Sequence, residues 1–195
     1  GGGMGTMGVV LRGQGAGGIG STVRRAVAGL GGVRIRTVSA GINHTLACSD
    51  EGVAYSYGEG THGQLGHGDT ADQYSPRLVS ALQGVRVSAV AAGLHHSLVL
   101  SEAGRVYSFG SGMCGQLGHS NTAVQLMSHM IAGLQGVRVR SVAAGYSTSL
   151  AVATDGEVYG WGQGVDYDGG HLVLGLELTD HQLVPLKYPG LRLHA

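Results

Sequence analysis

The chain has 195 residues, a length that suits one sizeable core or a short array of repeats. Its 38 glycines exceed the usual share of roughly 7 per cent, yet 43% of the residues are hydrophobic, which favours a folded, turn-rich protein over a disordered one. Basic and acidic residues number 12 each and the basic ones are scattered, so no nucleic-acid-binding patch is expected.

The two cysteines, Cys48 and Cys114, are too few for a disulfide framework, which indicates a reducing compartment. The sequence has no signal peptide and no stretch of about 18 apolar residues, so membrane insertion is not expected. We therefore expect an intracellular protein, in the cytoplasm rather than in the nucleus. The chain opens with Gly1 instead of Met, which favours a piece of a longer protein.

The N-terminal part of the chain divides into two segments. Residues 1–20 form a Gly-rich leader of low complexity. Residues 21–32 (STVRRAVAGLGG) match residues 73–84 (QYSPRLVSALQG), which makes them the remnant of a blade-like repeat whose beginning is missing.

The rest of the chain is an internal repeat. Residues 33–84 align with residues 85–136 without a gap, and 24 of the 52 positions are identical. A third, diverged copy occupies residues 137–191, with about five extra residues after Gly164, and residues 192–195 form a tail. A period of this size is typical of arrays and propellers built from one repeated unit.

Each copy has the pattern of four short strands. In the first copy, VRIRTVSAG, HTLAC and VAYSYG are rich in Val, Tyr and small residues and are too short for helices. Hairpin turns are expected at SDEG (49–52) and SEAG (101–104), and a final strand around Arg77–Ser80. We therefore predict an all-β fold, a partial β-propeller of tandem four-stranded antiparallel blades with about three blades plus a remnant.

The third strand of each copy carries aromatic residues at alternate positions. Tyr57, Phe109 and Trp161 are equivalent in the three copies, and each is preceded two residues earlier by a tyrosine. Alternate residues of a strand share one face of the sheet. We expect these aromatic side chains to fill the layer between sheets.

The strings AGINHTLACSDEGVAYSYGEGTHGQLGHGD and AGLHHSLVLSEAGRVYSFGSGMCGQLGH closely resemble the repeat of the regulator of chromosome condensation family. The resemblance covers residues 21–191 and rests on three motifs in constant order: AGxxHS/T, an aromatic residue before Gly, and GQLGH. It implies a seven-bladed propeller, which about seven copies would close. We expect the missing blades to lie outside this chain; self-association that covers the open sheet edges is the alternative.

The recurring polar residues are interpreted as blade architecture. His44 and His96 share one repeat position, where the third copy has Thr148, and no base or nucleophile has a unique place beside them. Gln64 and Gln116 lie in Gly-rich loops and are expected to hydrogen-bond backbone groups there. We therefore expect no catalytic residue.

Metal and cofactor sites are not expected either. His62 and His67 lie five residues apart in one loop, and Cys114 and His119 replace them in the second copy, but no second pair with ligand spacing follows. The neighbours His95 and His96 are expected to point to opposite faces of a strand. No GxxxxGK[ST] string indicates a phosphate site.

The insertion in the third copy breaks the repeat and is the best local candidate for a specific contact. Loops that interrupt a scaffold are common binding sites, although a solvated surface loop is the alternative. The candidate protein-binding residues are Asp166, Tyr167, Asp168 and His171.

The resemblance implies several functions, because members of the family include a nuclear exchange factor for a small GTPase, plant ultraviolet-B photoreceptors and modules of ubiquitin ligases. The photoreceptor tryptophans resemble a GWRHT pattern, and residues 41–45, 93–97 and 145–149 lack that Trp, so ultraviolet sensing is not expected. We expect a non-enzymatic protein-binding scaffold. The alternative is a guanine-nucleotide exchange factor or regulator of a small GTPase, which would then be the protein partner.

Overall fold

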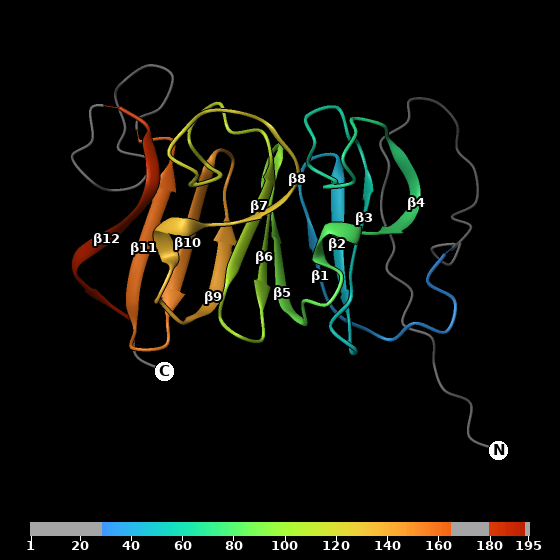
Figure 1. The fold of residues 1–195 in the computed structure, drawn as a ribbon, viewed down its shortest axis with the longest axis horizontal. Coiled ribbons are helices and arrows are strands. Elements are labelled where there is room, and N and C mark those ends of the chain that lie inside the picture. Colours follow the sequence, from blue (N-terminus) through green and yellow to red (C-terminus); the bar gives the residue numbers. More distant parts are fainter. Residues whose placement is uncertain (1–28, 165–179, 194–195) are drawn as a thin grey trace, which may run out of the picture.

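Three four-stranded antiparallel β-sheets stand side by side in the structure (Figure 1). It is a computed structural model that describes residues 29–164 and 180–193. Strand order in each sheet follows the chain, so each sheet is an up-and-down meander. The predicted all-β partial propeller with three four-stranded blades is confirmed. The predicted leader and most of the predicted remnant lie outside the described residues.

Each blade contains four strands, and a short 3₁₀ helix follows each of the first two. The first blade comprises β1 (Ile35–Ala40), β2 (His44–Ser49), β3 (Ala54–Gly58) and β4 (Gln73–Leu78), followed by η1 (Ser80–Leu82). The second comprises β5 (Val87–Ala92), β6 (His96–Ser101), β7 (Val106–Gly110) and β8 (Gln125–Met130), followed by η2 (Ala132–Leu134). The third comprises β9 (Val139–Ala144), β10 (Thr148–Ala153), β11 (Glu157–Gly162) and β12 (Gln182–Arg192).

The hairpin turns fall where the sequence predicted them, but the outer strand of the first blade does not. Gly52 and Gly104 adopt φ angles of 79° and 77°, which glycine tolerates without strain. The final strand was predicted around Arg77–Ser80, whereas β4 starts at Gln73 and Ser80 already belongs to η1. The strand exists but lies earlier than predicted because β3, its pairing partner in the described part of the chain, is in register with Gln73 at Gly58 and with Leu78 at Tyr55.

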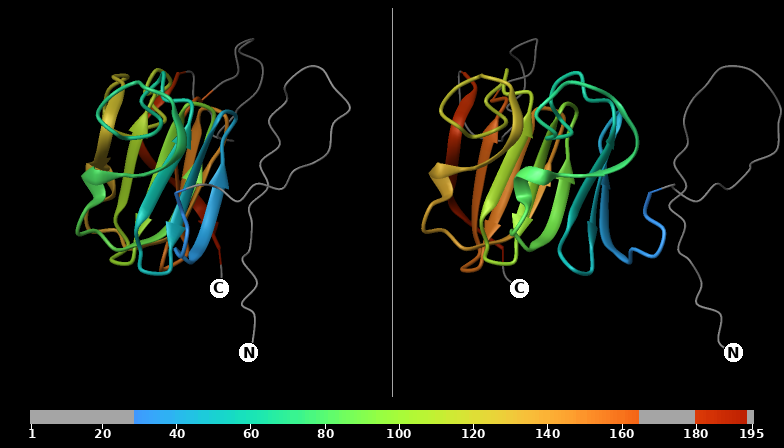
Figure 2. Two further views of the ribbon diagram at one scale, coloured as in Figure 1. Left: turned by 90° about the vertical axis from the view of Figure 1, so that its right-hand side faces the viewer. Right: turned by 45° about the vertical axis from the view of Figure 1, so that its right-hand side comes forward.

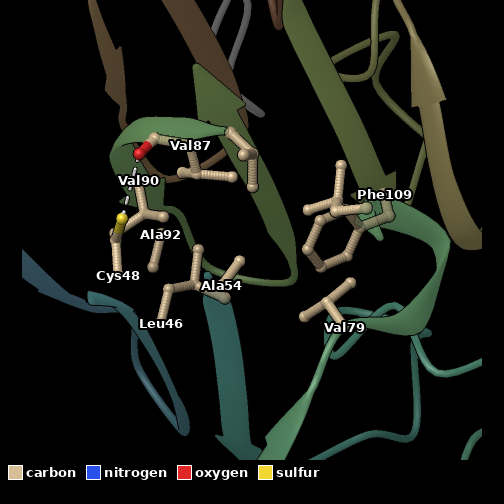
Figure 3. Packing of buried hydrophobic residues seen from close by; sticks show 10 residues of the cluster. Leu46, Cys48, Ala54, Val79, Val87, Val90, Ala92 and Phe109 are labelled. Carbon is tan, nitrogen blue, oxygen red and sulfur yellow. Dashed lines mark hydrogen bonds between the residues drawn. The ribbon is translucent and has the colours of Figure 1, made fainter. Parts of the chain in front are cut away.

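The hydrophobic core lies between blades and not within them. One buried cluster joins Leu46 and Val79 of the first blade to Val99 and Phe109 of the second, as Figure 3 shows for part of this layer. A second cluster joins the second blade to Trp161 and its neighbours in the third blade. Each sheet therefore depends on the next one for its apolar burial, as in other repeat folds.

Among the described residues, no further sheet covers the two outermost faces of the array. Leu150 on β10 is 37% exposed, whereas the equivalent residue Leu98 on β6 is fully buried. On the opposite side Val38 of β1 is 45% exposed and its equivalent Val90 of β5 is 8% exposed. The views in Figure 2 show the blades facing one another in sequence order, with β1–β4 and β9–β12 at the two ends.

No helix within the described part of the chain is long and apolar enough to cross a membrane.

Candidate functional site

The turns that carry the repeat motifs gather at one end of the blades. Because neighbouring strands are antiparallel, the β1–β2, β5–β6 and β9–β10 turns lie at the same end as the long loops after β3 and β7, at the top of Figure 1. We call this surface the loop end. At this end, turns from all three blades lie next to one another.

A row of glycines brings the turns of the loop end into contact. A Cβ atom on Gly41 would lie 2.4 Å from the carbonyl oxygen of Gly93, and one on Gly93 would lie 2.6 Å from the carbonyl oxygen of Gly145. Cβ atoms essentially never approach other atoms this closely. The glycine of the AGxxH motif is therefore required by the close approach of successive blades.

An apolar residue follows each of these glycines. Ile42 is 62% exposed, Tyr146 is 57% exposed and Leu94 is partly buried between their two turns. The Leu94 N–H donates to the carbonyl oxygen of Tyr146 at 3.1 Å, so these two turns touch directly. Met113, in the loop after β7, adds a further exposed apolar side chain (69%) at this end. The loop end thus presents a row of apolar side chains to solvent, which is a common property of protein-binding surfaces.

Behind this row, hydrogen bonds between buried polar groups join the first blade to the second. His44 Nε2 lies 2.9 Å from Ser97 Oγ, and the Ser97 hydroxyl donates to the carbonyl oxygen of Gln64 at 2.7 Å. Because a serine hydroxyl has a single proton, His44 Nε2 must be the donor to Ser97. Ser97 of the second blade is therefore fixed by two groups of the first.

The same pattern of hydrogen bonds recurs between the second and third blades. His96 Nε2 lies 3.0 Å from Ser149 Oγ, and Ser149 donates to the carbonyl oxygen of Gln116 at 2.8 Å. Burial lowers the pKa of His44 to about 4 and the pKa of His96 to about 3, so both imidazoles are neutral at neutral pH. Each serine gives its proton to a carbonyl group and not to the imidazole, so neither pair is arranged as a base with its nucleophile.

The two glutamine side chains stabilise the GQLGH loops. Gln64 Oε1 accepts a hydrogen bond from the His62 N–H, and Gln116 Oε1 accepts one from the Cys114 N–H, both at 2.8 Å. At the end of the first of these loops His67 Nε2 lies 3.0 Å from Ser56 Oγ of β3. The loops of the first two blades are thus attached to the sheets by side chains that recur in both copies.

The three equivalent aromatic residues are buried, and Phe109 and Trp161 lie in the layers between blades. Phe109 and Trp161 have no exposed surface, and Tyr57 is 8% exposed. Trp161 Nε1 also donates to the carbonyl oxygen of Gln116 at 2.8 Å, which joins the third blade to the second. The candidate binding residues Asp166, Tyr167, Asp168 and His171 lie outside the described residues.

The structure brings together three residues that sequence reasoning did not connect. One ligand atom from each of Glu59, His62 and His95 lies within 4.8 Å of the others. Sequence spacing had paired His62 with His67, but His62 instead stacks on His95 of the next blade with ring centroids 4.0 Å apart. The available signal was departure from the repeat, because none of the three residues recurs at its equivalent positions.

Two family models of repeat sequences match the chain. The family model described as regulator of chromosome condensation (RCC1) repeat matches residues 51–100 and 103–152. A second model with the same description matches residues 35–64, 87–116 and 139–167. The chain belongs to the RCC1 repeat family. The predicted family resemblance is therefore confirmed.

Relatives in this family carry different names and lengths. The ultraviolet-B receptor UVR8 of Arabidopsis thaliana is 41% identical over 157 residues, which cover 80% of this chain and 34% of the receptor. The human E3 ubiquitin-protein ligase HERC2 is 39% identical over 156 residues, which cover 79% of this chain and 3% of the ligase. The chain thus spans about a third of the receptor and a small part of the ligase.

A solved structure of the family has the same arrangement of blades. Prp20p from Saccharomyces cerevisiae, whose crystal structure was described with its binding properties to Gsp1p and histones, superposes with a TM-score of 0.68 and 28% sequence identity. The match covers 79% of this chain and 38% of Prp20p. RCC1 repeats therefore support a role as a binding scaffold or regulator, and the particular partner remains a matter of proposal.

Proposed function

We propose that this chain is a protein-binding module without catalytic chemistry of its own, and that it binds its partner through the loop end. The observation that carries the proposal is the apolar row formed by the exposed Ile42 and Tyr146 and the partly buried Leu94 between their turns. These side chains stand on turns that pack closely against one another, so the surface is organised before a partner arrives. Apolar and aromatic anchors of this kind carry most of the energy in protein interfaces.

The polar chemistry of the repeats supports a non-enzymatic role. The buried His–Ser pairs are uncharged hydrogen-bonded links between blades. In each pair the serine hydroxyl donates to a main-chain carbonyl oxygen, that of Gln64 or of Gln116. Relatives named as a receptor and a ubiquitin ligase share the repeats over part of their length. We therefore assign the repeats to binding in a larger assembly.

A substitution at the loop end tests this proposal. The double variant Ile42→Asp/Tyr146→Asp should lose most of the proteins that the immobilised wild-type chain enriches in quantitative mass spectrometry. The variant Tyr74→Asp is the matched control, because Tyr74 is 96% exposed but lies on the outer strand β4. Equal enrichment by all three chains, with unchanged thermal unfolding, would contradict binding through the loop end.

Nucleotide exchange on a small GTPase is the second candidate function. It is favoured by the similarity to Prp20p, which was described together with its binding to Gsp1p. An exchange factor needs no covalent step and would leave no catalytic motif. Faster release of a fluorescent guanine nucleotide from one member of a GTPase panel, at substoichiometric concentrations of the chain, would establish exchange activity over simple binding.

We also propose that the exposed faces around Val38 and Leu150 are covered in the working protein by further blades or by other copies of the chain. Light scattering on the protein encoded by the full open reading frame measures its native mass. This mass distinguishes further blades in one chain from several copies of the chain. An intracellular and mainly cytoplasmic location is proposed from the two free cysteines, and fluorescence microscopy of a tagged protein tests it.

A further inference from the structure

We propose that Glu59, His62 and His95 form a binding site for a divalent transition metal ion, with Zn²⁺ as the preferred ion, at the junction of the first two blades. Glu59 and His62 come from the loop after β3, and His95 directly precedes β6 of the next blade. One ligand atom from each of the three side chains lies within 4.8 Å of the others. All three side chains are partly buried, so an ion here would still be reached from solvent.

The blade architecture does not require these residues. The repeat positions of Glu59 are Ser111 and Gln163, and those of His95 are Asn43 and Ser147. The backbone is nevertheless the same in the three blades. The N–H groups of residues 59, 111 and 163 donate to the carbonyl oxygens of residues 43, 95 and 147, respectively. The donor set is therefore an addition to the scaffold at one junction only, among the described residues.

The carboxylate of Glu59 is prepared as a ligand. Asn43 Nδ2 donates to Glu59 Oε2 at 2.7 Å, and the Thr61 hydroxyl donates to Glu59 Oε1. Hydrogen bonds from neighbouring residues that orient a carboxylate are a regular feature of metal sites.

The imidazole of His95 has a nitrogen atom without a hydrogen-bond partner. Its Nδ1 is buried and makes no hydrogen bond, which is costly for a polar atom that no ligand satisfies. A neutral imidazole keeps the lone pair that a metal ion needs. A metal ion bound to His95 Nδ1 would give this nitrogen a partner.

The donor set decides which ion fits. Two imidazoles and one carboxylate suit Zn²⁺ and similar ions, whereas Mg²⁺ and Ca²⁺ prefer oxygen ligands. Three protein ligands leave a fourth position for water. The lone pairs lie in the ring planes, so coordination requires the stacked rings of His62 and His95, now 19° from parallel, to turn about their terminal torsions.

The site would act as a clamp, because its ligands come from two different blades. An ion that binds only the folded chain stabilises it in proportion to the logarithm of its concentration over Kd. Zn²⁺ should therefore raise the unfolding temperature of protein that has been treated with a chelator, and Mg²⁺ should not. Isothermal titration calorimetry should find a Zn²⁺ site that depends on these three residues.

Substitutions copied from the repeat make the test specific. His95→Asn introduces the residue found at the same position of the first blade, and Glu59→Ser introduces that of the second blade. Each should weaken Zn²⁺ binding at least about tenfold and remove the zinc-dependent rise in unfolding temperature. His129→Asn is the matched control, because it removes an exposed histidine on the outer strand β8.

The outcomes are distinguishable. Absence of a zinc-dependent shift in the wild type, or the same affinity in His95→Asn and Glu59→Ser as in the wild type, would overturn the site. If a variant does not fold, protection of His62 and His95 from diethyl pyrocarbonate by Zn²⁺ in the wild-type chain gives the answer by peptide mass spectrometry. Protection of other histidines alone would also overturn the proposal.

Discussion

His96 Nε2 lies 3.0 Å from Ser149 Oγ across the boundary between the second and third blades, and both side chains are fully buried. Ser149→Ala would leave the His96 N–H without an acceptor in the protein interior. We expect a loss of about 1–3 kcal/mol in the free energy of unfolding, measured with urea. Ser75→Ala, on the exposed side of β4, should leave the free energy unchanged. A neutral Ser149→Ala substitution would show that the His–Ser bond does not hold the blades together.

Gly93→Ala tests the close approach of the turns at the loop end. The added methyl group would lie 2.6 Å from the carbonyl oxygen of Gly145 and 2.2 Å from the ring of His96, so the two turns must separate. We expect a destabilisation of about 1–3 kcal/mol. Gly31→Ala is the control, because nothing lies within 4 Å of the new Cβ atom. Thermal or urea unfolding of the pair measures the difference, and equal stability would contradict the packing of the turns.

The equivalent residues Leu98 and Leu150 test whether burial comes from the next blade. Leu98→Ala empties a fully buried position and should cost about 2–5 kcal/mol. Leu150 has the same place in its blade but is 37% exposed, so Leu150→Ala should cost less than about 1 kcal/mol in dilute monomeric protein. Similar losses in both variants would mean that another surface covers the third blade under those conditions. Urea unfolding at two protein concentrations then shows whether the covering surface belongs to a second copy or to the same chain.

The buried histidines predict a loss of stability in acid. The pKa values of His44 and His96 in the folded chain, about 4 and about 3, lie below the unfolded value of about 6.5. The unfolded chain therefore binds more protons between these limits. Stability is fully present above about pH 6.5 and falls as the pH drops toward 4, by up to about 1.4 kcal/mol per pH unit for each histidine.

Urea unfolding between pH 7.5 and 4 measures this dependence. The variant His96→Gln keeps a donor for Ser149 but does not titrate, so its stability should change less steeply with pH than that of the wild type. Burial also lowers the pKa of His67 and of His119, so a slope should remain in the variant. An unchanged slope in His96→Gln would contradict the low pKa of His96.

The repeat made most of the fold predictable. Its 52-residue period and the alternation around Tyr57, Phe109 and Trp161 predicted three blades of four strands, because strand pattern and turn chemistry are local properties. The outer strand of the first blade was placed too late along the chain. Its start at Gln73 depends on register with Gly58 of β3, which is a non-local pairing.

The candidate sites divide along the same line. By itself the sequence determined that His44, His96, Gln64 and Gln116 are recurring positions of a blade. Only the tertiary structure decided what they touch, and only it placed Glu59 and His62 beside His95. These residues, 33 and 36 positions from His95 in the chain, meet it there because successive sheets bury their apolar faces against each other. This packing places the loops of one blade on the turns of the next.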